Sequence, residues 1–432
     1  MARKLFGTDG VRGEVGSFLT ADLALALGRA ATAGSPAERP RVLLIRDTRE
    51  SGDMLESALA AGVTAAGGDA YLGGVLPTPA APLLVRRYGF DLAAVISASH
   101  NPFADNGIKF FGADGFKLSD AAELEIEREL EERTGRREGV GRVHELHGTQ
   151  EDYLRELGVR FDGLDLSGTK VLLDCANGAT HRVAPEIFRR LGAEVTLHAI
   201  EPDGRNINEG CGSTHVEALA ARVAAEGHDV GFAFDGDGDR VLAVDRTGAI
   251  VDGDELLALA ALYKQATGVA VTVMTNYGFH AAMKAAGVAV ETTQVGDRYV
   301  LEALRERGWA LGGEQSGHII DMDFVPSGDG IASALLTLEA LGGGDLADRH
   351  AMEKLPQKLV NVRVSDRVAA MNAPEIAEAV KREHAALEGR GRVLLRPSGT
   401  EPVVRVMVEA PTADEADAVC GRLVAIVTVA AG

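Results

Sequence analysis

The feature that most constrains the fold is a pattern of apolar strand, polar turn, helix, glycine and second strand that occurs three times. The first apolar runs of the three repeats are residues 42–45, 171–173 and 271–274. The glycines that close the three helices are at 67–68, 192 and 287. The apolar runs that follow them are residues 70–72, 195–197 and 288–290. Short β-rich runs that alternate with glycine-terminated helices predict βαβ units. We therefore expect three related α/β domains.

The part of the chain after residue 355 has a different pattern. Strand-like residues 359–364 precede a helix that Pro374 opens, and strand-like residues 393–395 and 403–408 follow. A last helix begins at Thr412 and Glu415, the two ends of a capping box. This order predicts a small α+β domain. The expected domains are 1–150, 151–251, 252–354 and 355–432.

Composition excludes several classes of protein. Asp and Glu outnumber Lys and Arg by 64 to 44, a net charge of −20, which argues against nucleic acid or an anionic membrane as the partner. An anionic ligand must therefore be held by local cations. The three cysteines form no CxxC pair, the chain starts without a signal-like apolar segment, and no apolar run is long enough to span a bilayer. We expect a cytoplasmic protein.

The most specific local sequence is DGDGDR at 235–240, in which glycines separate Asp235, Asp237 and Asp239. Apolar runs flank it, so we expect a loop between two strands. Carboxylates this close repel one another unless a cation lies among them, and oxygen ligands favour Mg²⁺ or Ca²⁺. An EF-hand is excluded because its glycine and glutamate positions hold Arg240 and Arg246. The flanking apolar strands disfavour the alternative, a solvated acidic turn.

A second polar segment, SASHNP at 97–102, follows the apolar run 92–96. We expect that run to be a buried parallel strand, and α/β proteins place ligands in the loops after such strands. Ser99 is a candidate nucleophile, with His100 beside it and the cation Lys109 further along. The alternative is a turn with a serine helix cap. Neither the GxSxG elbow nor a P-loop occurs, so the segment is typical of neither an esterase nor a nucleotide kinase.

Three further glycine-containing loops are rich in polar groups. The segment RPSGTEP at 396–402, with Arg405 beyond it, combines an arginine fork, hydroxyls and an open backbone, which suit a phosphate. Its alternative is an ordinary hairpin turn. The segment GGEQSGH at 312–318 has groups that pair with sugar hydroxyls, although alone it is better explained as an ordinary loop. In the segment 7–13, Arg12 lies in a glycine-rich turn that suggests anion contact.

In their order along the chain, these five segments resemble the landmark loops of the α-D-phosphohexomutase superfamily. The resemblance covers the chain from residue 7 to residue 402. It implies three phosphoglucomutase-like α/β domains and a C-terminal α+β domain like the TATA-binding protein, around a central cleft. The segments 313–318 and 295–298 resemble the bacterial branch that acts on glucosamine phosphates, since phosphomannomutase/phosphoglucomutase enzymes tend to carry Met where this chain has Gln315.

The resemblance also implies a role for each motif residue. Ser99 would be carried as phosphoserine and would complete a Mg²⁺ site with Asp235, Asp237 and Asp239. The implied catalytic neighbours of that site are Arg12, His100, Lys109 and Arg240. The implied sugar-contact residues are Glu314, Ser316 and His318. The implied clamp for the non-reacting phosphate is Arg396, Ser398, Gly399, Thr400 and Arg405.

The implied reaction interconverts glucosamine 6-phosphate and glucosamine 1-phosphate through glucosamine 1,6-bisphosphate, a step toward UDP-N-acetylglucosamine and peptidoglycan. Phosphoserine, three carboxylates and Mg²⁺ sum to about −3, so several cations must converge on the site. Lys109 and His100 are both candidates for the general base. Relatives make a homodimer plausible. The alternatives are a phosphomannomutase/phosphoglucomutase and a non-catalytic phosphosugar-binding sensor, which should have lost Ser99 or a carboxylate.

Overall fold

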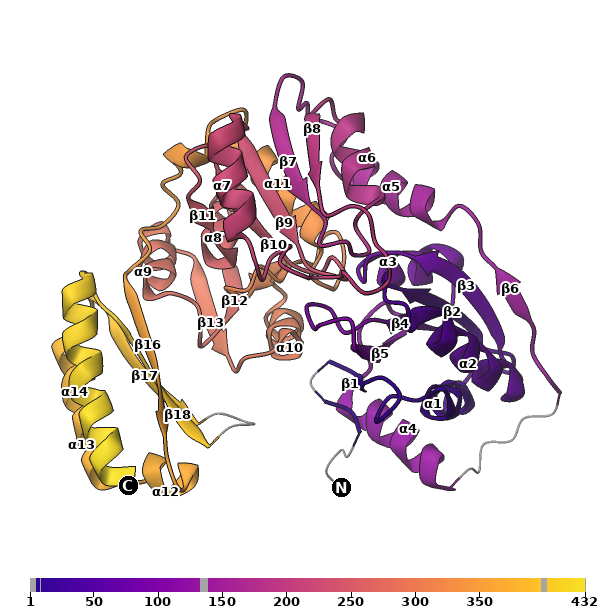
Figure 1. Ribbon diagram of the computed structural model, residues 1–432, viewed down its shortest axis with the longest axis horizontal. Helices are drawn as coiled ribbons and strands as arrows, with labels where there is room; N and C mark the ends of the chain where they lie inside the picture. The colour runs from indigo at the N-terminus through magenta and orange to yellow at the C-terminus, as the bar shows by residue number, and fades with distance from the viewer. Residues whose placement is uncertain (1–4, 8, 133–138, 398–401, 432) are drawn as a thin grey trace. The chain divides into compact units, whose positions relative to one another are not determined.

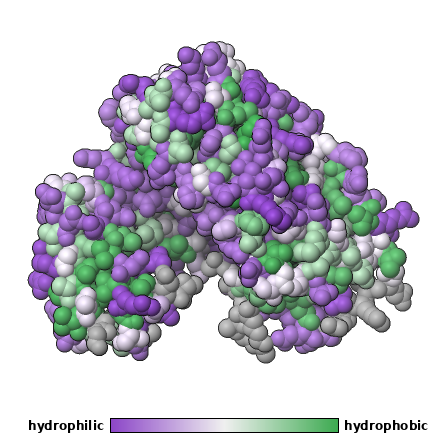
Figure 2. Space-filling view, in the orientation of Figure 1, coloured by the Kyte–Doolittle hydropathy of each residue, from purple (hydrophilic) through white to green (hydrophobic). Residues whose placement is uncertain are grey.

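The computed structural model describes residues 5–7, 9–132, 139–397 and 402–431 of the chain (Figure 1). The chain forms two compact units. The larger unit contains residues 1–274 and 289–349, and the smaller contains residues 275–288 and 350–432. On the face drawn in Figure 2, hydrophilic and hydrophobic residues are interspersed over both units. Among the described residues, no helix has the length and apolar character that a membrane crossing requires.

The first sheet of the larger unit has six strands in the order β1-β5-β4-β2-β3-β6. These are β1 (Val11–Glu14), β2 (Arg41–Arg46), β3 (Asp69–Val75), β4 (Leu92–Ile96), β5 (Asp105–Gly112) and β6 (Val143–Glu145). The helices are α1 (Ala21–Ala33), α2 (Gly52–Ala65), α3 (Ala80–Tyr88) and α4 (Asp120–Glu132). Strand β2 is parallel to both β3 and β4, and every residue of β4 is buried. Because β4 is central and apolar throughout, the loop that follows it is held rigidly at the carboxyl edge of the sheet.

The second sheet has the order β11-β10-β9-β7-β8. Its strands are β7 (Lys170–Asp174), β8 (Glu194–His198), β9 (Val230–Phe234), β10 (Val241–Asp245) and β11 (Ile250–Val251). Its helices are α5 (Thr149–Arg160), α6 (Val183–Arg190) and α7 (Glu217–Glu226). Strands β9 and β10 are antiparallel neighbours, so the residues between them form a short hairpin loop. That loop is the aspartate segment.

The third sheet has the order β13-β12-β14-β15. Its strands are β12 (Gly268–Thr272), β13 (Ala289–Thr293), β14 (Leu311–Gly313) and β15 (Ile319–Asp321). The helices are α8 (Gly253–Tyr263), α9 (Tyr277–Ala286), α10 (Asp297–Arg307) and α11 (Gly330–Leu341), with the short 3-10 helix η1 (Leu346–Asp348). The hairpin between β14 and β15 contains most of the segment GGEQSGH.

The smaller unit has a three-stranded antiparallel sheet in the order β16-β18-β17. Its elements are β16 (Gln357–Arg363), α12 (Arg367–Met371), α13 (Pro374–Ala386), β17 (Arg392–Pro397), β18 (Val403–Glu409) and α14 (Ala413–Ala431). Val404, Val406 and Val408 of the central strand are buried in one core with Val419, Leu423 and Val427 of α14. The helices thus cover the sheet through a single apolar face, as an α+β domain requires.

Helix α9 belongs to the smaller unit although it lies between two strands of the third sheet in sequence. The buried carboxylate of Glu409 accepts hydrogen bonds from the Tyr277 backbone N–H (2.8 Å) and from Arg392 Nε (2.8 Å). Asn276 Nδ2 donates to the Leu355 carbonyl at 3.0 Å, and Arg392 Nη2 donates to the Thr275 carbonyl at 2.6 Å. The start of α9 is therefore bonded to the strands of the α+β domain.

The predicted fold class is confirmed. The strand pairs β2–β3, β7–β8 and β12–β13 are all parallel, as βαβ units require. One strand differs in position: the apolar run 271–274 was expected to form it, whereas β12 is Gly268–Thr272. Pairing with β13 ends at Thr272 and Thr293, and beyond it a single bond joins the Val273 N–H to the Thr293 carbonyl. The predicted domain boundaries remain predictions.

Candidate active site

Ser99 lies in the loop between β4 and β5, in a backbone conformation that is rare for a residue with a side chain. Its φ is 52°, in the left-handed region, which costs about 1–2 kcal/mol for a non-glycine residue. The residue is buried, and its Oγ donates a 2.5 Å hydrogen bond to Asp235 Oδ2. His100 Nδ1 is 3.4 Å from the same Oγ. Strain of this kind concentrates at functional sites, and here it directs a hydroxyl at a carboxylate.

Asp235, Asp237 and Asp239 are brought together by the loop between β9 and β10. All three are buried, and one carboxylate oxygen from each lies within 4.8 Å of the others. Gly236 allows the Ser99 loop to approach the triad closely, because a Cβ there would lie 2.6 Å from the Ser99 carbonyl oxygen. The spacing of aspartates and glycines therefore produces the convergence that the sequence predicts.

Two carboxylate oxygens of this triad accept no hydrogen bond from the described residues. Asp237 Oδ1 and Asp239 Oδ1 are buried and make no hydrogen bond within the described chain. Burial, and then repulsion from Asp239 and Asp237, raise the pKa of Asp235 well above its usual value. Buried carboxylate oxygens without hydrogen bonds, on side chains that repel one another, are what a divalent cation would neutralise, and hard oxygen donors suit Mg²⁺. The residues present fit such an ion.

Lys109, on β5, is the cation closest to the triad. Its Nζ lies 2.8 Å from Asp237 Oδ2, 3.5 Å from Asp9 Oδ2 and 3.9 Å from Asp239 Oδ2. Burial alone would lower its pKa, but attraction to Asp237, Asp9 and Asp239 raises it. Lys109 is therefore charged and contributes a fixed positive charge beside the aspartate triad.

His100 differs from Lys109 in its protonation. Burial, and then repulsion from Arg240 and Arg12, lower the pKa of His100. Its Nδ1 is 3.2 Å from Arg240 Nη1 and faces the serine hydroxyl. The neutral imidazole can accept a proton, whereas the Lys109 ammonium can give one. Both general-base candidates are thus at the site, His100 neutral and Lys109 positively charged.

Arg12 and Arg240 approach the serine loop from two different sheets. Arg12, on β1, is ion-paired with Asp9 and directs Nη1 toward the Ala98 carbonyl at 3.4 Å. Arg240 follows the triad, and its backbone N–H donates to Asp235 Oδ1 at 3.2 Å. Two guanidinium groups are therefore within reach of a phosphate carried on Ser99. Such cations are needed because the formal charge of phosphoserine, three carboxylates and Mg²⁺ is negative.

Glu314, Ser316 and His318, in the loop after β14, differ in burial and in the groups that they contact. His318 is buried, with Nδ1 3.5 Å from Asp239 Oδ2 and Nε2 accepting the Gly328 N–H at 3.1 Å. Glu314 Oε1 accepts the Gly296 N–H at 3.1 Å, and Ser316 is exposed. His318 thus contacts Asp239 of the aspartate triad directly, while Ser316 is open to a ligand. Their roles in sugar recognition remain predictions.

The sequence did not single out Lys117, which connects two parts of the site. Its ammonium, on a side chain that is 9% exposed, is ion-paired with both Asp9 and Asp297. Burial alone would lower its pKa, but Asp297 and Asp9 raise it. Asp9 lies in the segment 7–13, which the sequence identifies as a motif, whereas Lys117 lies in none of the five motifs. A second omission is Thr78, whose Oγ1 donates to Asp237 Oδ2 at 2.6 Å.

The predicted phosphate clamp lies in the smaller unit. Arg396 on β17 and Arg405 on β18 are direct cross-strand partners. Burial and repulsion from Arg405 lower the pKa of Arg396. Like charges that face each other across a sheet are destabilising, so this pair suits an anionic ligand. The other clamp residues, Ser398, Gly399 and Thr400, lie outside the described residues.

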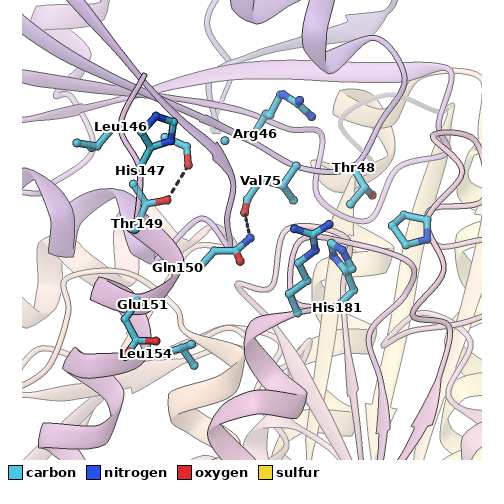
Figure 3. Close-up of a pocket in the computed structure, with 15 residues that line it drawn as sticks. Arg46, Thr48, Val75, Leu146, His147, Thr149, Gln150, Glu151, Leu154 and His181 are labelled. Carbon is cyan, nitrogen blue, oxygen red and sulfur yellow. Dashed lines mark hydrogen bonds between the residues drawn. The ribbon is translucent and has the colours of Figure 1, made fainter. Parts of the chain in front are cut away.

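The larger unit also has a pocket of about 690 Å³ that is separate from these residues (Figure 3). The ends of β2 and β3, the start of α5 and the loop before α6 line it. Figure 3 shows Gln150 Nε2 donating to the Val75 carbonyl, at 3.3 Å, and Thr149 Oγ1 donating to the Gly73 carbonyl, at 2.8 Å. None of the predicted site residues lines this pocket.

Comparison with known proteins decides the family. Four domain families of phosphoglucomutase/phosphomannomutase match the chain in order. Alpha/beta/alpha domains I, II and III match residues 3–137, 151–248 and 252–360, and the C-terminal domain matches residues 359–426. The chain belongs to the phosphoglucomutase/phosphomannomutase family. It is therefore a mutase, an enzyme of the isomerase class.

Similar members of this family share about half of the sequence. The phosphoglucosamine mutase of Moorella thermoacetica is 52% identical, covering 97% of this chain and 98% of its own. A phosphoglucosamine mutase of Thermus thermophilus is 54% identical, covering 94% of both chains. The resemblance to the superfamily found in the sequence is thus confirmed over nearly the whole chain.

Solved structures of the family share the fold at lower identity. A phosphoglucomutase/phosphomannomutase family protein from Burkholderia thailandensis superposes with a TM-score of 0.84 at 24% identity, over 99% of this chain and 97% of that one. The N-acetylphosphoglucosamine mutase of Aspergillus fumigatus, in complex with GlcNAc-6P and magnesium, has a TM-score of 0.66 at 18% identity, over 99% and 96% of the two chains. These likenesses support the fold.

Proposed function

We propose that this chain interconverts glucosamine 6-phosphate and glucosamine 1-phosphate. Support for the substrate comes from curated relatives between 46% and 54% identical that bear the name phosphoglucosamine mutase. Support for the chemistry comes from one observation, the buried Ser99 hydroxyl hydrogen-bonded to a member of the aspartate triad. Phosphoryl transfer depends mainly on positioning and on charge stabilisation, which a serine oxygen beside a divalent cation site supplies.

The proposed cycle starts with Ser99 as a phosphoserine. The C1 hydroxyl oxygen of glucosamine 6-phosphate attacks phosphorus, so the bond from phosphorus to Ser99 Oγ breaks and a bond to O1 forms. The hydroxyl proton passes to a basic side chain, for which the neutral imidazole of His100 is the candidate, because the Lys109 ammonium already carries its proton. The resulting glucosamine 1,6-bisphosphate reverses its orientation. Ser99 Oγ then attacks the 6-phosphorus, the bond from phosphorus to O6 breaks, and O6 takes up the proton that the base had received. Glucosamine 1-phosphate leaves.

The side chains divide this work by their charge. Asp235, Asp237 and Asp239, with a phosphoserine oxygen, would hold Mg²⁺, which polarises phosphoryl oxygens when bound. The two arginines near the serine loop, Arg12 and Arg240, would bind oxygens of the transferred group. In the smaller unit, the paired Arg396 and Arg405 would hold the phosphate that does not react. That clamp must grip phosphate rather than sugar hydroxyls, because both ends of the bisphosphate use it in turn.

The test is a coupled assay of mutase activity on glucosamine, glucose and mannose phosphates, each with Mg²⁺ and the matching bisphosphate. We expect the highest kcat/KM for glucosamine 6-phosphate. A higher kcat/KM for glucose or mannose phosphate would instead identify a phosphoglucomutase/phosphomannomutase, and no turnover of any would favour a binding protein.

The variant Ser99→Ala tests the phosphate carrier. We expect it to fold, to lack the added phosphate in the intact mass and to have no activity when bisphosphate is supplied. Ser167→Ala is the control, because it removes an exposed hydroxyl before β7 and leaves the carrier oxygen in place. Activity of Ser99→Ala near that of the wild type would refute the carrier role.

A further inference from the structure

Arg49 is a fully buried arginine whose side chain ends among the backbone carbonyls of the serine loop. It lies between β2 and α2, at a position that the sequence marked only as part of a polar turn. Its two Nη atoms donate to the carbonyl oxygens of Ser99 (2.8 Å), Asn101 (2.8 Å), Asp105 (2.9 Å) and Pro102. One side chain therefore satisfies four acceptors of a single loop.

Asp47 orients this arginine and reaches the same loop from the other side. Its Oδ2 accepts from Arg49 Nε at 2.9 Å and from Ser97 Oγ at 2.6 Å. Ser97 Oγ in turn accepts the Ser99 backbone N–H at 2.9 Å. The N–H of Ser99, through Ser97, and its carbonyl, through Arg49, thus both lead to one buried ion pair.

This double attachment acts on the residue with the strained backbone. A serine at a φ of 52° returns to an ordinary conformation unless its peptide groups are held. Asn208 adds a third restraint from the second sheet's domain, since its Nδ2 donates to the Ser99 carbonyl at 3.0 Å and the Asn101 carbonyl at 3.3 Å. Rotation of the Ser99 backbone would move Oγ away from Asp235.

We propose that Arg49 is a positioning residue for phosphoryl transfer, which holds the Ser99 backbone in the conformation that directs Oγ at the aspartate triad. This inference rests on the proposed function, because it assumes that Ser99 carries the phosphoryl group. Arginine suits the role because its donors lie in a rigid planar fork, whereas lysine has three donors on one nitrogen and cannot span four carbonyls.

The variant Arg49→Lys keeps the charge beside Asp47 and removes the fork. We expect kcat to fall about 100-fold, the cost of a misplacement of about 1 Å at the reacting atom, with KM for the sugar phosphate within twofold of the wild type. The matched control is Arg349→Lys, which also removes a guanidinium that pairs with two carboxylates, those of Asp245 and Glu255. That control should lower the melting temperature without changing kcat.

An Arg49→Lys protein that folds with a kcat within threefold of the wild type would overturn the proposal. If Arg49→Lys does not fold, Ser97→Ala replaces it, because it removes both the acceptor of the Ser99 N–H and the hydroxyl that connects it to Asp47, the ion-pair partner of Arg49. We then expect a tenfold fall in kcat at unchanged KM, and an unchanged kcat would overturn the proposal.

The same experiment separates this inference from the proposed function. If the wild type turns over no sugar phosphate, the proposed function fails, and a crystal structure of Arg49→Lys then decides the inference alone. A Ser99 φ that has left the left-handed region supports the positioning role, and an unchanged φ rejects it.

Discussion

The pair of Tyr153 and Asp329 makes the stability of the larger unit depend on pH. Tyr153, on α5, donates its hydroxyl to both oxygens of Asp329 at 3.0 and 2.9 Å, and Asp329 caps α11 by accepting the Ala332 N–H at 2.9 Å. Burial raises the pKa of Asp329 from 3.8 to about 6, although the Ala332 and Tyr153 hydrogen bonds lower it. At about 1.36 kcal/mol per pH unit, the difference between those values corresponds to about 3 kcal/mol.

The sign follows from which state holds the proton more tightly. The folded pKa is above the unfolded one, so this stabilisation is fully present below pH 3.8 and is lost as the pH rises through about 6. The perturbation is Asp329→Asn, which keeps an oxygen for the helix cap and cannot ionise. We expect the free energy of unfolding of the wild type, relative to that of the variant, to fall by about 2.5 kcal/mol between pH 4 and pH 8.

Urea unfolding at each pH, followed by circular dichroism, measures this difference. Asp22→Asn is the control, because it removes an exposed carboxylate and should leave the difference flat. Tyr153→Phe should move the fall to higher pH and cost a further ~1.5–3 kcal/mol at pH 8, since the ionised carboxylate loses its side-chain donor. A wild-type minus Asp329→Asn difference that is constant from pH 4 to pH 8 would refute the reasoning.

Three further predictions concern the charged groups. Mg²⁺ should raise the melting temperature of the wild type but not of Asp237→Asn, because the ion relieves repulsion within the triad; equal shifts in calorimetry would contradict this. Arg396→Ala should raise KM about 10- to 100-fold, the loss of a charge-assisted hydrogen bond, while the intact mass still shows phosphate on Ser99; an unchanged KM would reject the clamp. Lys117→Met should cost ~3–5 kcal/mol in urea unfolding, and adding Asp297→Asn should recover part of it, which an additive double variant would disprove.

The fold could be predicted because its signals are local and periodic. Apolar runs, closing glycines and capping residues each act within about ten residues, and together they define βαβ units. The error at 271–274 has the same origin, since apolar character continues past Thr272 although pairing with the neighbouring strand stops there. Where a strand ends depends on its partner, which the sequence of the strand itself does not contain.

The site divides along the same line. Ser99 and the aspartate triad could be predicted because each lies in a short, distinctive segment at the end of a strand. Arg49 and Lys117 could not, because their importance comes from contacts with residues distant in the chain, such as Asn101 and Asp297. A glycine in the sequence can indicate a left-handed backbone, but a serine does not. The strain at Ser99 could therefore be found only from the structure.

The assignment of α9 to the smaller unit means that the polypeptide passes between the two units three times, after residues 274, 288 and 349. A single cut after residue 274 or 288 leaves residues 350–432 covalently linked to residues 289–349 of the larger unit, whereas a cut after residue 349 leaves only residues 275–288 of the smaller unit linked to the larger. Deleting everything from residue 350 onward would strip the Tyr277 N–H of Glu409 and leave the start of α9 exposed. Anyone who wishes to isolate the arginine-bearing C-terminal module must therefore carry residues 275–288 along with it, as a grafted helix rather than by simple truncation.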